Sequence, residues 1–251
     1  MGTAAIPADD GAFLEGRGCY TTARICRGRA LWADRHARRL ERDARRLEIG
    51  EVDPAQVLQA LSELGRALFA NDEGIVRVQA SGGSRDGPRL IGIPRELGPE
   101  PGRWAARIAP FPHEGPTPWS GVKATNRLLY TLAAASARER GLDEAVLLDG
   151  SGYLVEGART NLVVVAGDGT LATPDLARGG VAGIAREILC ERVAELECRD
   201  IRGSELGRAR ELIAVNAVRG ACPVVCVDGI DVGNGEPGPW SRRLDEILSA
   251  E

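Results

Sequence analysis

The sequence lacks the features of a membrane protein and of a secreted one. No run of about 18 apolar residues occurs in its 251 residues, so no membrane span is expected. The first ten residues have neither a basic head nor an apolar core, so we expect no signal peptide and a cytoplasmic location. With 43% hydrophobic and 27% charged residues, the chain has the composition of a globular protein of one large or two modest domains.

Metal ligands are also scarce in this chain. Only two histidines are present, His36 and His113, and none of the six cysteines forms a Cys-x-x-Cys pair. Because these spacings do not match those of zinc sites, we expect no bound metal. We expect the cysteines to be free thiols in a reducing compartment.

Signals for nucleic acids and nucleotides are weak. The net charge is −4, whereas a general nucleic-acid binder usually has a basic balance. No Walker-type Gly-Lys-Ser run and no Gly-x-Gly-x-x-Gly after a strand is present, so nucleotide cofactors are not supported. Six arginines do fall within residues 35–46, but acidic residues interleave with them at spacings of three and four. This pattern favours a solvated helix face with internal ion pairs, although Arg39 or Arg46, which both lie beside the apolar stripe, can still bind a phosphate.

Lysine is nearly absent from the chain. Of the 32 lysine and arginine residues, only Lys123 is a lysine, and the other 31 are arginines. Arginine has no accessible neutral amine, whereas a lysine amine can lose its proton and attack a carbonyl. Two interpretations stay open on this count alone: Lys123 is a nucleophile that forms a Schiff base, or it is a surface lysine retained by chance.

Strand-like and helix-like patterns mix along the whole chain, which predicts an α/β (α+β) protein with two lobes. Extended segments are expected within 18–31, around a turn at Arg27-Gly28. The expected helices cover residues 34–49, with Asp34 as its cap, and 54–69, 126–140, 183–196 and 240–248. The expected strands cover residues 75–80, 90–93, 104–109, 145–148, 153–155, 162–165, 211–215 and 223–227.

One segment has the composition of an interdomain linker. Residues 110–121, PFPHEGPTPWSG, contain four prolines and two glycines. We therefore expect a smaller N-terminal α/β domain at 1–109 and a larger C-terminal α/β domain at 122–251, which carries Lys123.

Two further segments have both a functional and a plain interpretation. The loop at 179–183, Gly-Gly-Val-Ala-Gly, precedes a helix that begins near Ile184, and N–H groups at a helix start bind anions. Many such loops only connect elements, however. Asn216-Ala217 can form a second rim of the same kind. Glu156 is either a structural carboxylate or the partner of a ring nitrogen, whose protonated form it would favour.

Four motifs in a consistent order carry a resemblance to a known family. GRGCYTTARICRGRALWADRHARRLERDARRL resembles the amino-terminal signature of the fold-type IV pyridoxal-phosphate enzymes. GVKATNRLLYTLAAASARERGLDEAVLLDGSGYLVEGARTNLVVV resembles their central signature, and GGVAGIAREIL and ELIAVNAVRGACPV resemble the next two. The resemblance runs from about Gly16 to Asp228. It implies the two-domain fold-type IV architecture, pyridoxal 5′-phosphate as cofactor, a small-molecule substrate and a homodimer, with no nucleic-acid or membrane partner.

The resemblance also implies roles for seven residues at the cofactor. They are Lys123 for the Schiff base, Arg39 for the phosphate, Glu156 for the pyridine nitrogen, and Ile184, Ala185, Asn216 and Ala217 for a cup of backbone groups around the phosphate. Ala185 departs from the threonine of many relatives, which removes one hydroxyl contact. The loop at 81–89, SGGSRDGPR, does not align cleanly, so Arg85 and Arg89 receive no role.

Within the family, the sequence is most similar to the 4-amino-4-deoxychorismate lyases. Thr21 stands where the aminotransferases usually have an acidic residue, and Asn126-Arg127-Leu128 follows Lys123 as in the lyases. The resemblance then implies that Lys123 acts as general base and that 4-aminobenzoate and pyruvate are released. Thr21 would give a proton to the leaving enolpyruvyl group, or it is a strand threonine chosen for packing. A D-amino-acid or branched-chain aminotransferase is the alternative, and a non-enzymatic nucleic-acid-binding module is a remote one.

Overall fold

The computed structural model describes residues 5–84 and 87–250. Arg85 lies outside the described residues. The contacts divide the chain into two compact units, one made of residues 1–99 and 122–127 and the other of residues 100–121 and 128–251. Each unit has its own sheet and its own core.

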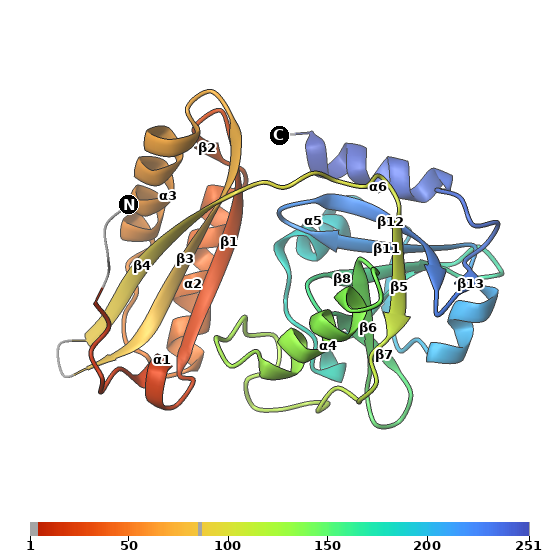
Figure 1. Ribbon diagram of the computed structural model, residues 1–251, viewed down its shortest axis with the longest axis horizontal. Helices are drawn as coiled ribbons and strands as arrows, with labels where there is room; N and C mark the ends of the chain where they lie inside the picture. The colour runs from red at the N-terminus through yellow and green to blue at the C-terminus, as the bar shows by residue number, and fades with distance from the viewer. Residues whose placement is uncertain (1–4, 85–86, 251) are drawn as a thin grey trace. The chain divides into compact units, whose positions relative to one another are not determined.

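The first unit is built around an antiparallel sheet with the strand order β2-β1-β3-β4. Its elements in chain order are α1 (Gly11–Leu14), β1 (Gly18–Cys26), β2 (Arg29–Ala30), α2 (Ala33–Arg46), α3 (Pro54–Phe69), β3 (Glu73–Ser84) and β4 (Gly87–Glu96). Helices α2 and α3 pack against each other and against β1 and β3 (Figure 1). The expected turn at Arg27-Gly28, between β1 and β2, is confirmed.

The alternation of side chains in β1 and β3 decides which residues meet the helices. Ile25 of β1 and Val78 of β3 are fully buried in the core that α2 and α3 share with the sheet. Because successive residues of a strand point to opposite faces, Thr21 shares the helix-covered face with Ile25, whereas Tyr20 and Arg77 lie on the other face. The sheet therefore presents Thr21 to α2.

The two helices of this unit begin in different ways. Helix α3 has Pro54 at its first position, and the Asp53 carboxylate caps it by accepting from Ala55 N at 2.8 Å. The expected cap of α2 was wrong. This helix begins at Ala33, with Trp32 at the cap position in a left-handed conformation, and Asp34 lies in the first turn, where its charge suits the helix dipole.

The segment 122–127 returns to the first unit after the chain has entered the second. Lys123 O accepts a hydrogen bond from Tyr20 N of β1 at 3.0 Å. Lys123 N donates to Asp43 Oδ2 of α2, also at 3.0 Å, and the Asp43 side chain is fully buried. The backbone of Lys123 is thus fixed between the start of β1 and the middle of α2.

The second unit contains a mixed nine-stranded sheet with the order β10-β9-β8-β11-β12-β5-β6-β7, and β13 pairs with β12. Its elements are β5 (Trp104–Ile108), α4 (Leu128–Arg138), β6 (Glu144–Leu148), β7 (Leu154–Gly157), β8 (Asn161–Val165), β9 (Leu171–Pro174), η1 (Leu176–Arg178), α5 (Ile184–Arg192), β10 (Leu196–Arg199), η2 (Gly203–Arg208), β11 (Glu211–Asn216), β12 (Gly220–Val227), β13 (Ile230–Asp231) and α6 (Pro239–Ser249). Helix α4 packs on β6, whereas α5 and α6 pack on each other and on β11 (Figure 1).

Both faces of this sheet are covered at β6 and β8, so these two strands are mostly apolar. In β6, Val146 belongs to the same core as Leu162 of β8, whereas its neighbour Ala145 packs with Ala133 and Ala137 of α4. The small alanine side chains let α4 lie close to the strand. Strands buried on both faces have continuous apolar runs instead of alternation, and this explains why these strands could be recognised as short apolar runs.

The division into units differs from the expected domains of 1–109 and 122–251 with a linker at 110–121. Strand β5 pairs in parallel with β6 and with β12, and both of these strands belong to the second unit. The expected linker is also held there, because His113 N donates to Leu148 O at 2.7 Å. The segment expected to join the domains is therefore part of the second unit.

The expected elements differ from the observed ones mainly at their ends. The helix expected at 183–196 ends at Arg192, and Leu196 already begins β10. Strands β9 and β10 were not expected, because each has only four residues and neither alternates nor forms an apolar run. Of the helices in the described part of the chain, none combines the length and the apolar character that a bilayer crossing requires.

Asp43→Ala should lower the free energy of unfolding by about 1–3 kcal/mol, because the partly buried Lys123 N–H loses its acceptor. Urea denaturation of the two proteins measures the difference. Glu51→Ala is the control, since this exposed carboxylate follows the same helix and should change stability by no more than about 0.5 kcal/mol. Equal effects of the two substitutions would contradict the role of Asp43.

Candidate functional site

In the first unit, three side chains meet between β1 and α2. Arg39 Nη2 donates to Thr21 Oγ1 at 2.6 Å, and the same oxygen lies 2.6 Å from His36 Nδ1. Thr21 and His36 are fully buried, and Arg39 is 6% exposed. Of the residues predicted from the sequence, Thr21 and Arg39 are therefore in direct contact, and the Thr21 hydroxyl is engaged by both neighbours.

The protonation of His36 follows from its surroundings. Its pKa lies well below the usual 6.5, because burial and the positive charges of Arg39 and Lys123 oppose the protonated ring. Thr21 Oγ1, which accepts from Arg39, lies 2.6 Å from Nδ1 of the neutral ring and so links the guanidinium to the imidazole. His36 Nε2 is buried, and none of the described residues is its hydrogen-bond partner.

The opposite face of this sheet carries a group of cations around one aromatic ring. Arg77 Cζ lies 3.5 Å from the centre of the Tyr20 ring, Lys123 Nζ lies 5.1 Å from it, and Arg127 Cζ lies 5.9 Å from it. The pKa of Arg77 is lowered by burial, and the charges of Arg95 and Arg127 lower it further, against the effect of Tyr20. This face of the first unit is therefore strongly positive beside the lysine.

In the second unit, Glu156 of β7 is held by donors from three segments. Its carboxylate is 2% exposed. Oε1 accepts from Tyr130 Oη of α4 at 2.7 Å, and Oε2 accepts from Asn161 Nδ2 of β8 at 3.1 Å and from Val181 N at 3.0 Å. Three donated hydrogen bonds stabilise an ionised carboxylate, so Glu156 is a fixed negative charge.

His113 extends this arrangement by one more residue. Its Nε2 lies 3.0 Å from Tyr130 Oη, and its Nδ1 accepts from Gly115 N at 3.0 Å. Burial lowers the pKa of His113, although the charges of Glu114 and Asp149 act in the opposite direction.

Two positions in the loop at 179–183 must be glycine, because other atoms of the chain lie too close for a Cβ atom. Gly179 has a φ of 102°, and a Cβ there would collide with the carbonyl of Gly115. A Cβ at Gly183 would collide with the Asn161 side chain. Helix α5 starts directly after Gly183, which is its cap residue and has no side chain to fill the cap position. The first N–H groups of α5, at Ile184 and Ala185, therefore form the kind of helix start that binds anions.

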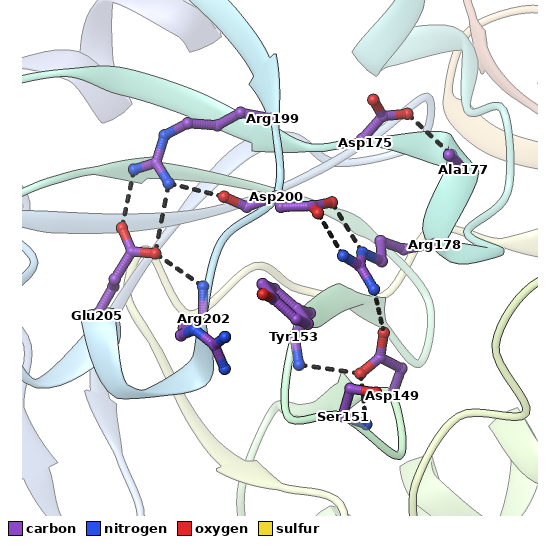
Figure 2. Close-up of polar contacts among 10 residues, drawn as sticks. All are labelled: Asp149, Ser151, Tyr153, Asp175, Ala177, Arg178, Arg199, Asp200, Arg202 and Glu205. Atoms are coloured by element: carbon purple, nitrogen blue, oxygen red, sulfur yellow. Dashed lines mark hydrogen bonds and ion pairs between the residues drawn. The ribbon is translucent and has the colours of Figure 1, made fainter.

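The residue before this loop is fixed by a network of charges (Figure 2). Arg178 forms a two-pronged ion pair with Asp200 and a further one with Asp149, whose oxygen lies 3.2 Å from Arg178 Nη1. The Tyr153 ring lies between two guanidinium groups, with Arg178 Cζ at 3.9 Å and Arg202 Cζ at 4.4 Å from its centre. These contacts tie η1 to the segments on either side of it and hold the start of the loop.

Asn216 builds the turn that joins β11 to β12. Its Oδ1 accepts from Val218 N at 2.9 Å and from Arg219 N at 2.8 Å. Its chain neighbour Val215 pairs with Asn161 in the sheet, so this turn begins next to β8, whose Asn161 side chain donates to Glu156. The Asn216 side chain thus shapes the turn, and Ala217 lies within it.

The predicted site residues therefore fall into two groups, one in each unit. Three of them lie in the first unit, namely Thr21, Arg39 and Lys123. The second holds the others, and their list is Glu156, Ile184, Ala185, Asn216 and Ala217. Sequence reasoning missed His36, His113, Tyr130 and Asn161. The two histidines were weighed only as metal ligands, although two histidines in a whole chain were a signal worth following.

Comparison with known proteins identifies the family. A family model for amino-transferase class IV matches residues 18–227. The chain belongs to the class IV aminotransferase family. Members of this family use pyridoxal 5′-phosphate, which is therefore the cofactor of this chain, and the predicted fold-type IV architecture is confirmed.

Individual relatives point in two directions. The branched-chain-amino-acid aminotransferase of Salmonella typhimurium is 34% identical over 136 residues, which are 52% of this chain and 43% of that protein. The chain thus matches less than half the length of such curated relatives. The structure of 4-amino-4-deoxychorismate lyase from Pseudomonas aeruginosa has a TM-score of 0.84 and 29% identity, and the match covers 100% of this chain and 96% of that one. The Escherichia coli branched-chain aminotransferase has a TM-score of 0.85 at 23% identity, with 97% and 88% coverage, and this shows the fold alone.

The residues present in each unit fit the cofactor. The first unit has a buried imidazole nitrogen without a described partner at His36, beside the cations Arg39 and Lys123, which suits an anionic group. The second has a fixed carboxylate at Glu156, which suits a protonated ring nitrogen, and an uncapped helix start at Ile184, which suits a phosphate. Pyridoxal phosphate carries both a phosphate and a ring nitrogen.

The buried histidines should make the protein less stable in acid. Because the pKa of His36 is lower in the folded state than its usual 6.5, the unfolded chain takes up a proton below that pH that the folded chain does not. Stability is therefore complete above pH 6.5 and falls as the pH decreases, by about 1.4 kcal/mol for His36 between pH 7.5 and 5.5. Urea denaturation at both pH values measures the loss. Over the same pH range, the free energy of unfolding of a His36→Gln variant should fall less than that of the wild type, by the contribution of His36. An identical pH dependence in both proteins would contradict the prediction.

Proposed function

We propose that this enzyme is a pyridoxal-phosphate-dependent lyase that converts 4-amino-4-deoxychorismate into 4-aminobenzoate and pyruvate. The observation that carries the proposal is the positive face of the first unit, where Arg77 and Arg127 lie with Lys123 around the Tyr20 ring. The proposed substrate has two carboxylates, one on the ring and one on the enolpyruvyl group, and guanidinium groups bind carboxylates through paired hydrogen bonds. A branched-chain amino acid has one carboxylate and an apolar side chain, so it offers fewer anionic groups to these cations.

Two further observations support a lyase. In the comparison of structures, the Pseudomonas aeruginosa lyase matches 100% of this chain at 29% identity, whereas the Escherichia coli branched-chain aminotransferase matches 97% of it at 23% identity. Thr21 also replaces the acidic residue that the resemblance led us to expect in aminotransferases. Its hydroxyl accepts the hydrogen bond of Arg39 without cancelling the charge of that guanidinium.

The residues of the chain would have the following roles in cofactor binding and proton transfer. Lys123 would hold the cofactor through its amine, and the released amine would take the proton from the substrate carbon that bears nitrogen. When bound, the cofactor supplies an electron sink for that carbon. Glu156 would keep the ring nitrogen protonated, and Arg39 and the start of α5 at Ile184 and Ala185 would bind the phosphate. Asn216 and Ala217 would complete the phosphate cup from their turn.

The role of Thr21 is narrowed by its position. Its hydroxyl lies under α2 and is engaged by His36 and Arg39. We therefore propose that Thr21 orients Arg39, and its direct role as a proton donor to the leaving group stays a prediction.

The alternative function is a branched-chain or D-amino-acid aminotransferase. The 34% identity to the Salmonella typhimurium branched-chain enzyme over 136 residues favours it. Both reactions need the same lysine, carboxylate and phosphate ligands, so substrate assays must separate them.

The deciding experiment gives the holoenzyme 4-amino-4-deoxychorismate without any keto acid. We expect 4-aminobenzoate and pyruvate in equal amounts. The protein is then given D-alanine or L-leucine with 2-oxoglutarate. Turnover only in this second assay would overturn the lyase proposal in favour of the alternative, and no turnover of any of these substrates would overturn both.

Lys123→Arg should remove activity even though it keeps the charge, because arginine cannot supply a neutral amine. We expect turnover to fall by at least about 10²–10⁴-fold and the absorbance of bound cofactor to disappear. Borohydride reduction of the wild type should attach the cofactor to the peptide that contains Lys123, the only lysine of the chain, as mass spectrometry can show. Exposed Arg140→Ala is the control. Full activity in Lys123→Arg would refute the role of this residue.

A further inference from the structure

The Glu156 carboxylate is the end of a chain of hydrogen bonds that begins in the segment at 110–121. Its Oε1 receives the Tyr130 hydroxyl proton at 2.7 Å, and Tyr130 Oη lies 3.0 Å from His113 Nε2. None of the sequence motifs or comparisons gives a role to His113 or Tyr130. Both residues belong to the second unit, as Glu156 does.

The direction of every bond in this chain is determined by its first member. Gly115 N donates to His113 Nδ1 at 3.0 Å, and a backbone N–H can only donate, so Nδ1 must be an acceptor. The neutral ring then carries its proton on Nε2 and donates it to Tyr130 Oη. Tyr130 in turn donates its proton to Glu156, which accepts and cannot return it. Burial, which lowers the pKa of His113, keeps the ring in this neutral form.

The same histidine is fixed against the loop before α5. A Cβ on Gly179 would come within 3.0 Å of His113 Cε1, so the loop backbone lies directly on the imidazole ring. His113 N also donates to Leu148 O at 2.7 Å, which ties the residue to the end of β6. The ring therefore has little freedom to turn and to reverse the order of donors.

We propose that His113 and Tyr130 are positioning residues that hold Glu156 in one orientation as a pure acceptor for the ring nitrogen of the cofactor. This inference rests on the proposed role of Glu156. A carboxylate has about four acceptor positions, so three protein donors and one ring N–H can be accommodated together. With the other donors at Asn161 and Val181, the chain fixes both carboxylate oxygens before the cofactor arrives.

The test compares the affinity of the apoprotein for pyridoxal phosphate with the protonation of the cofactor's ring nitrogen. Tyr130→Phe removes the donated proton and keeps the ring. We expect its dissociation constant for pyridoxal phosphate to rise about tenfold, since one charge-assisted hydrogen bond is lost. Nitrogen NMR of cofactor labelled at the ring nitrogen should show that this nitrogen loses its proton about one pH unit lower than in the wild type. Tyr153→Phe is the matched control, because that ring is held by Arg178 and Arg202 through its face.

A double-mutant cycle tests whether His113 acts through Tyr130. In His113→Asn the amide oxygen can still accept from Gly115 N, but the donor to Tyr130 is lost. We expect about a threefold weaker affinity for pyridoxal phosphate, and the double variant should be no weaker than Tyr130→Phe alone. Independent, additive losses would overturn the proposed chain.

Three outcomes distinguish this inference from the function on which it rests. If the wild type binds no pyridoxal phosphate, the proposed function fails and the inference falls with it. If the wild type binds but Tyr130→Phe has the same affinity and the same nitrogen titration, the inference alone is overturned. A weaker affinity with an unchanged nitrogen titration, together with a lower melting temperature of the apoprotein, would show that Tyr130 serves packing only and would also overturn it.

Discussion

The hydrogen bond from Lys123 N to the buried Asp43 carboxylate is the contact on which the arrangement of the first unit depends. The chain enters the second unit at Glu100, 23 positions before Lys123, yet Lys123 belongs to the first unit. Without an acceptor on α2 the returning segment would leave a partly buried N–H unpaired, which is costly. Asp43 thus links the helix that carries His36 and Arg39 to the only primary amine among the side chains of the protein.

In each unit a hydroxyl group links a charged side chain to a buried histidine. The charge is positive in the first unit and negative in the second. In the first, the Arg39 cation donates to the Thr21 hydroxyl, whose oxygen lies 2.6 Å from Nδ1 of the buried imidazole of His36. In the second, the buried imidazole of His113 donates to the Tyr130 hydroxyl, which donates to the Glu156 anion. A hydroxyl group can accept one hydrogen bond and donate another, and a neutral imidazole has one donor and one acceptor nitrogen. A neutral histidine can therefore be linked through a hydroxyl to a cation, as His36 is, or to an anion, as His113 is. Both histidines must stay neutral for this.

The features that could be predicted from the sequence were those carried by local chemistry. Asp53-Pro54 marks the start of α3 because a carboxylate cap and a proline are both favourable there. Lys123 could be singled out because all the other lysine and arginine positions of the chain are arginines. Its return to the first unit was not predictable, because the bond to Asp43 joins residues 80 positions apart and leaves no pattern in either segment. The same holds for Tyr130, whose spacing in α4 is that of an ordinary helix residue and whose importance comes only from Glu156.

The expected linker shows how composition can mislead. Prolines and glycines at 110–121 indicate a segment without regular structure, and this much is correct. They do not indicate whether the segment is mobile or fixed, because that depends on partners elsewhere. Here His113 is bonded to Leu148 O through its backbone and to Gly115 N and Tyr130 through its ring. An irregular segment with such partners is a structural part of its unit, and its irregular backbone lets one histidine contact β6, α4 and its own segment.

The choice of a threonine at position 21 connects the fold to the proposed substrate. A carboxylate in its place would face Arg39 at hydrogen-bond distance inside a buried pocket and would neutralise it. A hydroxyl accepts the same hydrogen bond and leaves the charge in place, so the first unit keeps Arg39 as a cation under α2, in addition to Lys123 and Arg77 at the Tyr20 ring. Burial of several like charges is unfavourable unless an anion joins them. A phosphate at Arg39 and substrate carboxylates at the Tyr20 face would supply that anion, and a substrate with two carboxylates would gain more from it than a neutral side chain does.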